Sequence, residues 1–184
     1  MGYNLWEGER VRLRAIEPSD WEWFHHYEQD SEAARLMDRI PIPRSKDESQ
    51  SWISREMIPQ DGFRLAVETL NRELVGSIST HACDKKNGTF QYGIFIFRKH
   101  WRKGYASEAI ALLLRYYFGE LSYQKVTVYV HSFNHGSIRL HTNLGFQLEG
   151  RLRRMVYTQG RYYDQLVFGL TKEEFYAGRN QPRD

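Results

Sequence analysis

The hydrophobic period of the chain changes near residue 63, and this change limits the folds that are open to it. Three runs, residues 64–69, 74–82 and 89–97, are rich in the alternating, β-branched and aromatic side chains of strands. Short turn-rich linkers separate them, so they predict an antiparallel meander. Residues 106–118 then repeat apolar side chains at spacings of three and four, which predicts a helix with one apolar face.

The segments on either side extend this pattern. Residues 10–15 alternate charged and apolar side chains, as a strand with one solvent-exposed face does. Serine followed three residues later by glutamate, at Ser19 and again at Ser45, signals the start of a helix, so two or three helices are expected within residues 20–58. Downstream, the pattern predicts a strand over residues 126–130, a helix over residues 134–143 and strands over residues 146–155 and 161–170. Strand runs mixed with strand–helix–strand units indicate an α+β domain with a mixed sheet.

Length and composition restrict the class of protein further. The 184 residues suffice for one domain, expected over residues 1–177, and residues 178–184 are expected to form a disordered tail. A net charge of only +3 argues against a dedicated nucleic-acid binder. The single cysteine, Cys83, excludes an internal disulfide, and no spacing suits a metal site. The chain has no long apolar run, and residues 1–14 carry charges where a secretory signal needs apolar residues, so we expect a cytoplasmic protein.

A basic, glycine-containing stretch lies between a predicted strand and the helix over residues 106–118. It carries Arg98, Lys99, Arg102 and Lys103, followed by Gly104. A helix N-terminus offers unpaired N–H groups to an anion, and a glycine lets a phosphate approach the backbone. A solvated loop in which Gly104 eases a turn is an equally good interpretation. The absence of a Walker A or GxGxxG motif argues against a nucleoside triphosphate or a dinucleotide and leaves a phosphate-bearing ligand of another kind.

A second cluster lies on the helix predicted over residues 134–143. Asn134, Ser137 and His141 are three and four residues apart and therefore share one helical face. In the alternative interpretation, Asn134 serves only as the N-cap and His141 is only a surface residue. The spacing alone does not decide between a binding face and an ordinary amphipathic helix.

Residues 101–109 and 134–146 together resemble the acetyl-CoA-binding and following motifs of the Gcn5-related N-acetyltransferases (GNAT). Within that superfamily the chain is most similar to the branch of ribosomal-protein N-terminal acetyltransferases and spermidine acetyltransferases, and the resemblance covers nearly the whole chain. It implies a mixed central sheet of about seven strands, splayed between the fourth and fifth and flanked by helices.

The resemblance also implies an enzyme. It would transfer the acetyl group of acetyl-CoA to a primary amine, which is a protein N-terminus, a polyamine or another small amine, by direct attack in a ternary complex. A homodimer or larger homo-oligomer is common among relatives. The alternative is a non-catalytic module that binds CoA or acyl-CoA, suggested by His141 in a position where many members have tyrosine. A third alternative, attachment to RNA or the ribosome, would use Arg151, Arg153 and Arg154.

Cofactor-binding residues follow from the resemblance position by position. The signature falls on Trp101, Arg102, Lys103, Gly104, Tyr105 and Ala106, with Trp101 in place of glutamine or arginine. Backbone amides after Trp101 are expected to hold the CoA pyrophosphate. The pantetheine arm is expected to pair like an extra strand with Ile94, Phe95 and Ile96. The amide of Asn134 is expected to hydrogen-bond the pantetheine, with Ser137 on the same helical face.

Catalysis requires the amine to lose a proton and the departing sulfur to regain one. His141 is the expected proton donor and Ser137 its competitor. Glu149 and Glu68 are candidate general bases acting through water, and Asp164 borders the acceptor site in relatives or is an ordinary hairpin residue. Two further groups have an ordinary structural interpretation. The aromatic side chains near residue 24 read as a packing stripe rather than a ligand cage, and the acidic group Glu28, Asp30 and Glu32 either attracts a polyamine or is a solvated face.

Overall fold

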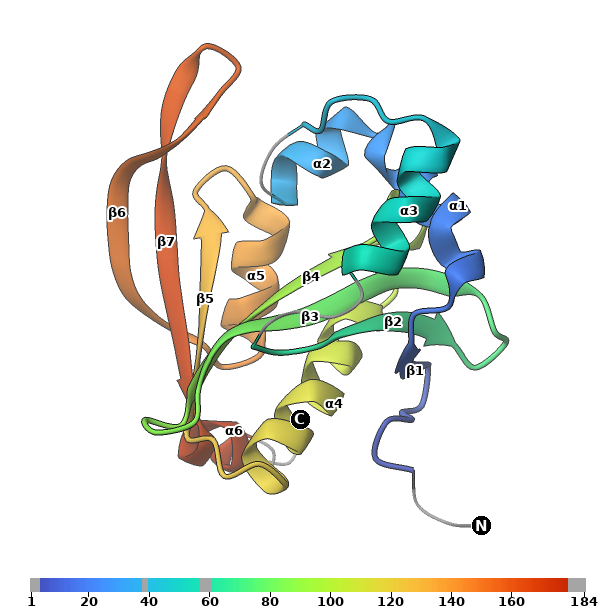
Figure 1. Cartoon of the computed structure of the whole chain (residues 1–184). Coiled ribbons are helices and arrows are strands. Elements are labelled where there is room, and N and C mark those ends of the chain that lie inside the picture. Colours follow the sequence, from blue (N-terminus) through green and yellow to red (C-terminus); the bar gives the residue numbers. More distant parts are fainter. Residues whose placement is uncertain (1–3, 38–39, 57–60, 179–184) are drawn as a thin grey trace.

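The computed structural model of the chain describes residues 4–37, 40–56 and 61–178 (Figure 1). Seven strands form one sheet in the order β1-β2-β3-β4-β5-β7-β6. Their bounds are Val11–Ala15 (β1), Arg64–Thr69 (β2), Leu74–Asp84 (β3), Thr89–Ile96 (β4), Lys125–His131 (β5), Gln147–Thr158 (β6) and Arg161–Thr171 (β7). Every strand pair is antiparallel except β4 and β5, which are parallel. The predicted α+β class with a mixed sheet is confirmed.

Six α-helices and two 3-10 turns occur in the part of the chain that the structure describes. Their bounds are Pro18–Asp20 (η1), Trp21–Glu28 (α1), Ser31–Met37 (α2), Lys46–Glu56 (α3), Arg98–His100 (η2), Tyr105–Gly119 (α4), His135–Asn143 (α5) and Lys172–Ala177 (α6). The predicted order of elements is confirmed, and α6 is an addition that the sequence pattern did not predict. In the described ranges no helix is long and apolar enough to cross a membrane. Of the predicted tail, only Gly178 lies within the described residues.

The two predicted capping boxes have different outcomes. At Ser45 the prediction is confirmed, because the Ser45 N–H donates to Glu48 and the Glu48 N–H donates to the Ser45 hydroxyl. At Ser19 it is wrong. The carboxylate of Asp20 accepts a hydrogen bond from the Glu17 N–H instead, so Glu17 is the N-cap and the helical segment begins at Pro18 with a 3-10 turn.

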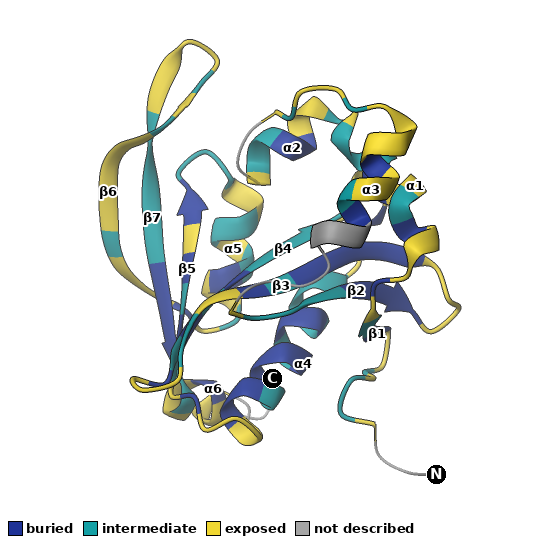
Figure 2. Cartoon of the chain, viewed as in Figure 1, coloured by how far each residue is buried: buried dark blue, intermediate teal, exposed yellow. Residues whose placement is uncertain are grey.

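The sheet separates two apolar clusters. Neighbouring residues on β2 point to opposite faces, so that Ala66 joins one cluster and Val67 the other. The first, which we call the α1–α3 cluster, contains Phe24, Ile53 and Phe97; the second contains most of the buried face of α4. Figure 2 shows buried residues along α4 and the central strands, whereas the outer part of the β6–β7 hairpin is largely exposed. The core therefore fixes β4 between the two layers of helices.

The parallel strands β4 and β5 separate after three pairs of residues. The register joins Thr89, Phe90 and Gln91 of β4 to Lys125, Val126 and Thr127 of β5 and then stops. Beyond this point α5 lies beside the two strands (Figure 1). Its His141 ring contacts Tyr92, the first β4 residue past the last pair. The splay between the fourth and fifth strands, expected from the resemblance, is confirmed.

Candidate functional site

The splay leaves one edge of β4 without a β5 partner over residues 92–96. The Phe97 N–H donates to the Val75 carbonyl on the opposite side, 2.9 Å away. Backbone groups alternate between the two edges of an antiparallel strand, so those of Ile94 and Ile96 point to the free edge and those of Phe95 point to β3. The Ile96 carbonyl already accepts a hydrogen bond from the indole N–H of Trp101 at 2.6 Å. Ile94 is thus the residue that best offers a donor and an acceptor to an extended ligand.

The loop after η2 gathers backbone N–H groups at the start of α4. The backbone is left-handed at Arg102 (φ 62°) and again at Gly104 (φ 82°), which is the N-cap of α4. Within the described residues, no hydrogen-bond acceptor is recorded for the N–H groups of residues 102–106. A Cβ added at Gly104 would collide with the guanidinium of Arg10 and would also be strained by the positive φ. Free N–H groups at the positive end of a helix dipole suit a phosphate.

Only part of the predicted positive charge is available at this loop. Arg98 forms ion pairs with Asp30 at 2.6 Å and with Glu32 at 2.8 Å. Lys99 pairs with Glu73 at 3.0 Å. Arg102 and Lys103 are exposed and have no ion pair among the described residues, so these two remain for an anion.

Asn134 uses both ends of its side-chain amide. The Oδ1 atom accepts a hydrogen bond from the Ser137 N–H at 3.0 Å, which makes Asn134 the N-cap of α5. The Nδ2 group donates to the carbonyl of Leu36 in α2, 3.1 Å away. The capping interpretation is confirmed. The second hydrogen bond joins the start of α5 to α2. The predicted bond from Asn134 to pantetheine would compete with the Leu36 contact.

His141 is buried, with 3% of its surface exposed. Its Nδ1 lies 2.8 Å from the Ser137 carbonyl, which can only accept, so Nδ1 carries the proton. Its Nε2 lies 2.8 Å from the Tyr92 hydroxyl. Burial lowers the pKa of His141 below its ordinary value, and the bond to Ser137 opposes this effect only in part. The ring is therefore neutral near pH 7 and accepts the Tyr92 O–H, and the interpretation as a surface residue is wrong.

Ser137 is the half-buried member of this group. Its hydroxyl lies 3.3 Å from Nδ1 of His141 and one helical turn before it. Tyr92, the other partner of His141, is almost fully buried, and burial raises the pKa of its hydroxyl well above the ordinary value. Sequence reasoning did not select Tyr92, because 49 residues separate it from His141 and only the splay brings them together.

The three acidic candidates are all engaged in ion pairs. Glu149 lies on β6 with its carboxylate 2.6 Å from the ammonium of Lys125, at the end of β5 that is still paired with β4. Asp164 on β7 accepts from the Arg154 N–H and pairs with Arg151, and these contacts lower its pKa.

Glu68 is buried on β2 between two arginines. Burial alone would raise the pKa of Glu68, but hydrogen bonds from Arg14 and Arg12 outweigh it and lower the pKa. The same arginine, Arg14, also pairs with Asp20 at 2.8 Å, which anchors η1 to the sheet. Glu68 is therefore part of a structural ion-pair network, and its recorded contacts do not connect it to Ser137 or His141.

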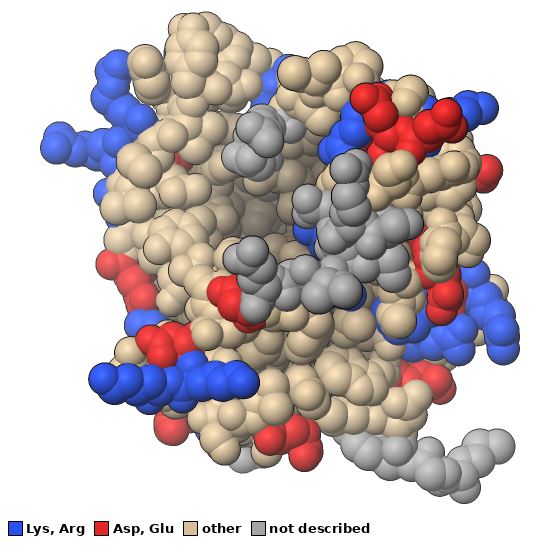
Figure 3. Space-filling model, in the orientation of Figure 1, with Lys and Arg blue, Asp and Glu red and all other residues tan. Residues whose placement is uncertain are grey.

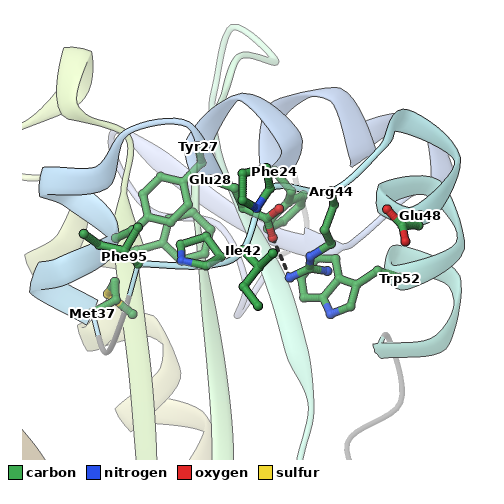
Figure 4. Close-up of a pocket in the computed structure, with 13 residues that line it drawn as sticks. Phe24, Tyr27, Glu28, Met37, Ile42, Arg44, Glu48, Trp52 and Phe95 are labelled. Atoms are coloured by element: carbon green, nitrogen blue, oxygen red, sulfur yellow. Dashed lines mark ion pairs between the residues drawn. The ribbon is translucent and has the colours of Figure 1, made fainter.

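A cavity of about 820 Å³ lies on the α1–α3 side of β4. Its walls come from α1, α2, α3, the segment 40–44 and one β4 residue, Phe95 (Figure 4). Four aromatic side chains line it: Phe24, Tyr27, Trp52 and Phe95. Phe24 and Tyr27 were expected to be packing residues only, and here they form both packing and cavity wall. Figure 3 shows that the surface on this side of the molecule is hollowed and that the visible walls of the hollow are mostly uncharged.

Comparisons with known proteins agree with this arrangement. Residues 10–147 match the family model of the acetyltransferase (GNAT) domain. The chain is 45% identical over 175 residues to the SPbeta prophage-derived uncharacterized N-acetyltransferase YokL of Bacillus subtilis, covering 95% of this chain and 97% of that protein. It is 25% identical to a spermidine N(1)-acetyltransferase of Vibrio cholerae, over 84% of this chain and 89% of that protein. A crystal structure of Vibrio cholerae spermidine N-acetyltransferase with CoA and spermine superposes with a TM-score of 0.81 at 22% identity, covering 92% of this chain and 99% of that one.

Proposed function

This chain belongs to the GNAT acetyltransferase family, and from that premise we propose that it transfers the acetyl group of acetyl-CoA to a primary amine by direct attack in a ternary complex. One observation carries the proposal. The free N–H groups of residues 102–106 and the unpaired edge of β4 belong to one continuous segment of chain, which ends where α4 begins. A ligand with a phosphate at one end and an extended amide chain at the other fits that segment.

The residues of this segment would hold acetyl-CoA as follows. The amides after Trp101 and the positive end of α4 would take the pyrophosphate, with Arg102 and Lys103 adding positive charge. The pantetheine amides would pair with Ile94 at the free edge, as an added strand does. The thioester would then lie in the splay, near Phe95 and the start of α5.

The same geometry suggests how the sulfur regains its proton. The neutral His141 ring is buried and both nitrogens already have partners, whereas Ser137 is partly accessible on the same helical face. We therefore assign the contact with the sulfur to Ser137, directly or through a water, and the orientation of Ser137 to His141. Glu149 stays the candidate general base, acting through water, and such a role requires its carboxylate to exchange Lys125 for that water.

The alternative function, a CoA-binding module without catalysis, is favoured by the burial of His141 at the position of the usual tyrosine. A thiol-release assay separates the two functions. The protein is incubated with acetyl-CoA and a panel of N-terminal peptides, spermidine and aminoglycosides, and free thiol is followed. Amine-dependent release above background supports the enzyme. Saturable acetyl-CoA binding without release for any amine supports the module.

A further inference from the structure

We propose that the acceptor amine carries one aromatic or similarly large apolar group and no second positive charge, and that this group occupies the cavity between α1, α2, α3 and β4. This inference rests on the proposed acetyl transfer and narrows its acceptor. It follows from three properties of the cavity: the arrangement of its aromatic walls, the pairing of its charges, and its position beside the free edge of β4.

The aromatic walls are already packed against one another. Tyr27 stacks on Phe95 with ring centroids 4.4 Å apart. The Phe24 ring packs edge-on against Phe95, with ring centroids 5.8 Å apart, and lies at a tilt to Trp52, with centroids 6.0 Å apart (Figure 4). Burial raises the pKa of Tyr27, so its ring presents an uncharged surface. Rings held by their neighbours need no reordering when a flat apolar group enters, which favours such a ligand.

Each described acidic side chain around the cavity already has a partner: three are in ion pairs, and the fourth accepts a backbone hydrogen bond. Glu28 pairs with Arg44 at 2.7 Å. Asp30 and Glu32 both pair with Arg98, as described above. Glu48 lies at the exposed edge of the cavity, where its carboxylate accepts the N–H of Ser45 at 2.8 Å and is in no ion pair among the described residues. A polyamine would therefore have to bury further ammonium groups deeper in the cavity, where the described carboxylate of Glu28 is already paired, and this is costly in an apolar site.

The cavity also adjoins the part of β4 that has no β5 partner. Phe95 forms part of its wall and belongs to the unpaired stretch of β4. Its neighbour Ile94 is the residue that we expect to hold the pantetheine. An apolar group in the cavity would therefore leave its amine close to the β4 edge, on the side opposite α4.

Arg44 is the residue that sets the charge of this site. Its guanidinium neutralises Glu28 and lies over the Trp52 ring, 4.9 Å from the centroid. Replacing it with an uncharged side chain of similar length would leave the Glu28 carboxylate free within the cavity. A free carboxylate favours an acceptor with a second positive charge. Arg44 is thus a specificity residue under this proposal.

The first experiment measures kcat/KM by thiol release for 2-phenylethylamine, n-propylamine and spermidine. Burial of a phenyl group predicts a value at least about tenfold higher for 2-phenylethylamine than for either other amine. Tetrapeptides that begin with phenylalanine or with serine identify the source of the apolar group. A preference for the phenylalanine peptide over 2-phenylethylamine assigns it to a protein N-terminus, and the reverse to a small amine. Equal values for all three amines, or a preference for spermidine, overturn the proposal.

The second experiment removes the positive charge of Arg44. In Arg44→Met, the ratio of kcat/KM for spermidine to that for 2-phenylethylamine should rise about tenfold or more. Lys86→Met, which removes an exposed positive charge in the β3–β4 turn, is the matched control and should leave the ratio unchanged. An unchanged ratio in Arg44→Met contradicts the assignment of Arg44.

A failure of acetyl transfer itself is distinguishable from a failure of this inference. If no amine releases thiol, the proposed function is wrong. Whether the cavity binds an apolar amine is then tested by measuring amine binding directly. Saturable quenching of tryptophan fluorescence by 2-phenylethylamine, lost in Trp52→Leu and absent with spermidine, supports the apolar acceptor site. No saturable change with 2-phenylethylamine, or a change with spermidine alone, overturns it.

Discussion

Ser137 and His141 have different surroundings, and substitution should separate their roles at the scale of single residues. Ser137→Ala removes a half-buried hydroxyl and should lower kcat by about 10²-fold, the scale of general acid catalysis, with little change in acetyl-CoA affinity. His141→Ala should also lower kcat, and in addition should lower the free energy of unfolding by about 2–3 kcal/mol, because it leaves the Tyr92 hydroxyl without its partner. Steady-state kinetics and urea unfolding measure both effects. A silent Ser137→Ala with an inactive but stable His141→Ala would return the donor role to His141.

Protonation of His141 should also couple stability to pH. Burial lowers the pKa of His141 and of His100 below the ordinary value of about 6.5, so the unfolded chain takes up protons at a higher pH than the folded protein. The unfolded state binds more protons below that value, and the free energy of unfolding must fall as the pH falls. Urea unfolding at pH 7.5 and 5.5 should show this fall in the wild type and a smaller one in His141→Leu. The same fall in both proteins would show that His141 does not contribute.

Cys83 should play no part in the transfer. Its sulfur lies 3.5 Å from the Tyr117 hydroxyl and 3.8 Å from the backbone carbonyl of His81, and no histidine ring is recorded as its partner in the described ranges. A nucleophilic thiol needs a base or a positive neighbour to form the thiolate. Cys83→Ala should keep kcat within about twofold of the wild type. Loss of turnover with acetyl-CoA binding intact would instead indicate a covalent acyl-enzyme.

At the scale of elements, Asn134 joins α5 to α2, and two substitutions divide its roles. Asn134→Ala removes the N-cap and should cost about 1 kcal/mol of stability as well as acetyl-CoA affinity. Asn134→Ser keeps a capping oxygen but loses the Nδ2 group, which donates to Leu36 and, in the proposed complex, to pantetheine. It should restore most of the stability and little of the affinity, as measured by unfolding and by titration calorimetry with CoA. Restoration of both by serine would make Asn134 a helix cap only.

Local patterns predicted most elements but not how they meet. The meander β2–β4, the helix α4 and the cap at Ser45 follow from periodicity and capping chemistry, which act over a few residues. The cap at Ser19 failed because Glu17 and Asp20 form the capping box instead, and Arg14 of β1 also pairs with the Asp20 carboxylate. The link between Tyr92 and His141 joins two elements that are distant in sequence. It depends on a splay that the resemblance, and not the pattern, predicted.

The candidate site was predictable to a similar extent. The loop over residues 102–106 was recognisable because its glycine and basic residues are contiguous, although the pairing of Arg98 with Asp30 and Glu32 removed part of the expected charge. The apolar cavity was not recognisable, because its walls come from three helices, one strand and the segment 40–44, and its aromatic residues have the spacing of ordinary packing. Likewise, the acidic group, for which the sequence left open a polyamine site or a solvated face, forms ion pairs with arginines outside its own segment.

At the scale of the whole molecule, we expect the two substrates to bind on opposite sides of β4. Acetyl-CoA would contact β4 and the start of α4, and the amine would enter from the α1–α3 cavity, so both must be bound before the acetyl group moves. The direct test is a matrix of initial rates of thiol release at varied acetyl-CoA and 2-phenylethylamine. The account predicts amine-dependent release with lines that intersect in the double-reciprocal plot. Parallel lines, which indicate an acyl-enzyme, or release that does not depend on the amine, would contradict it.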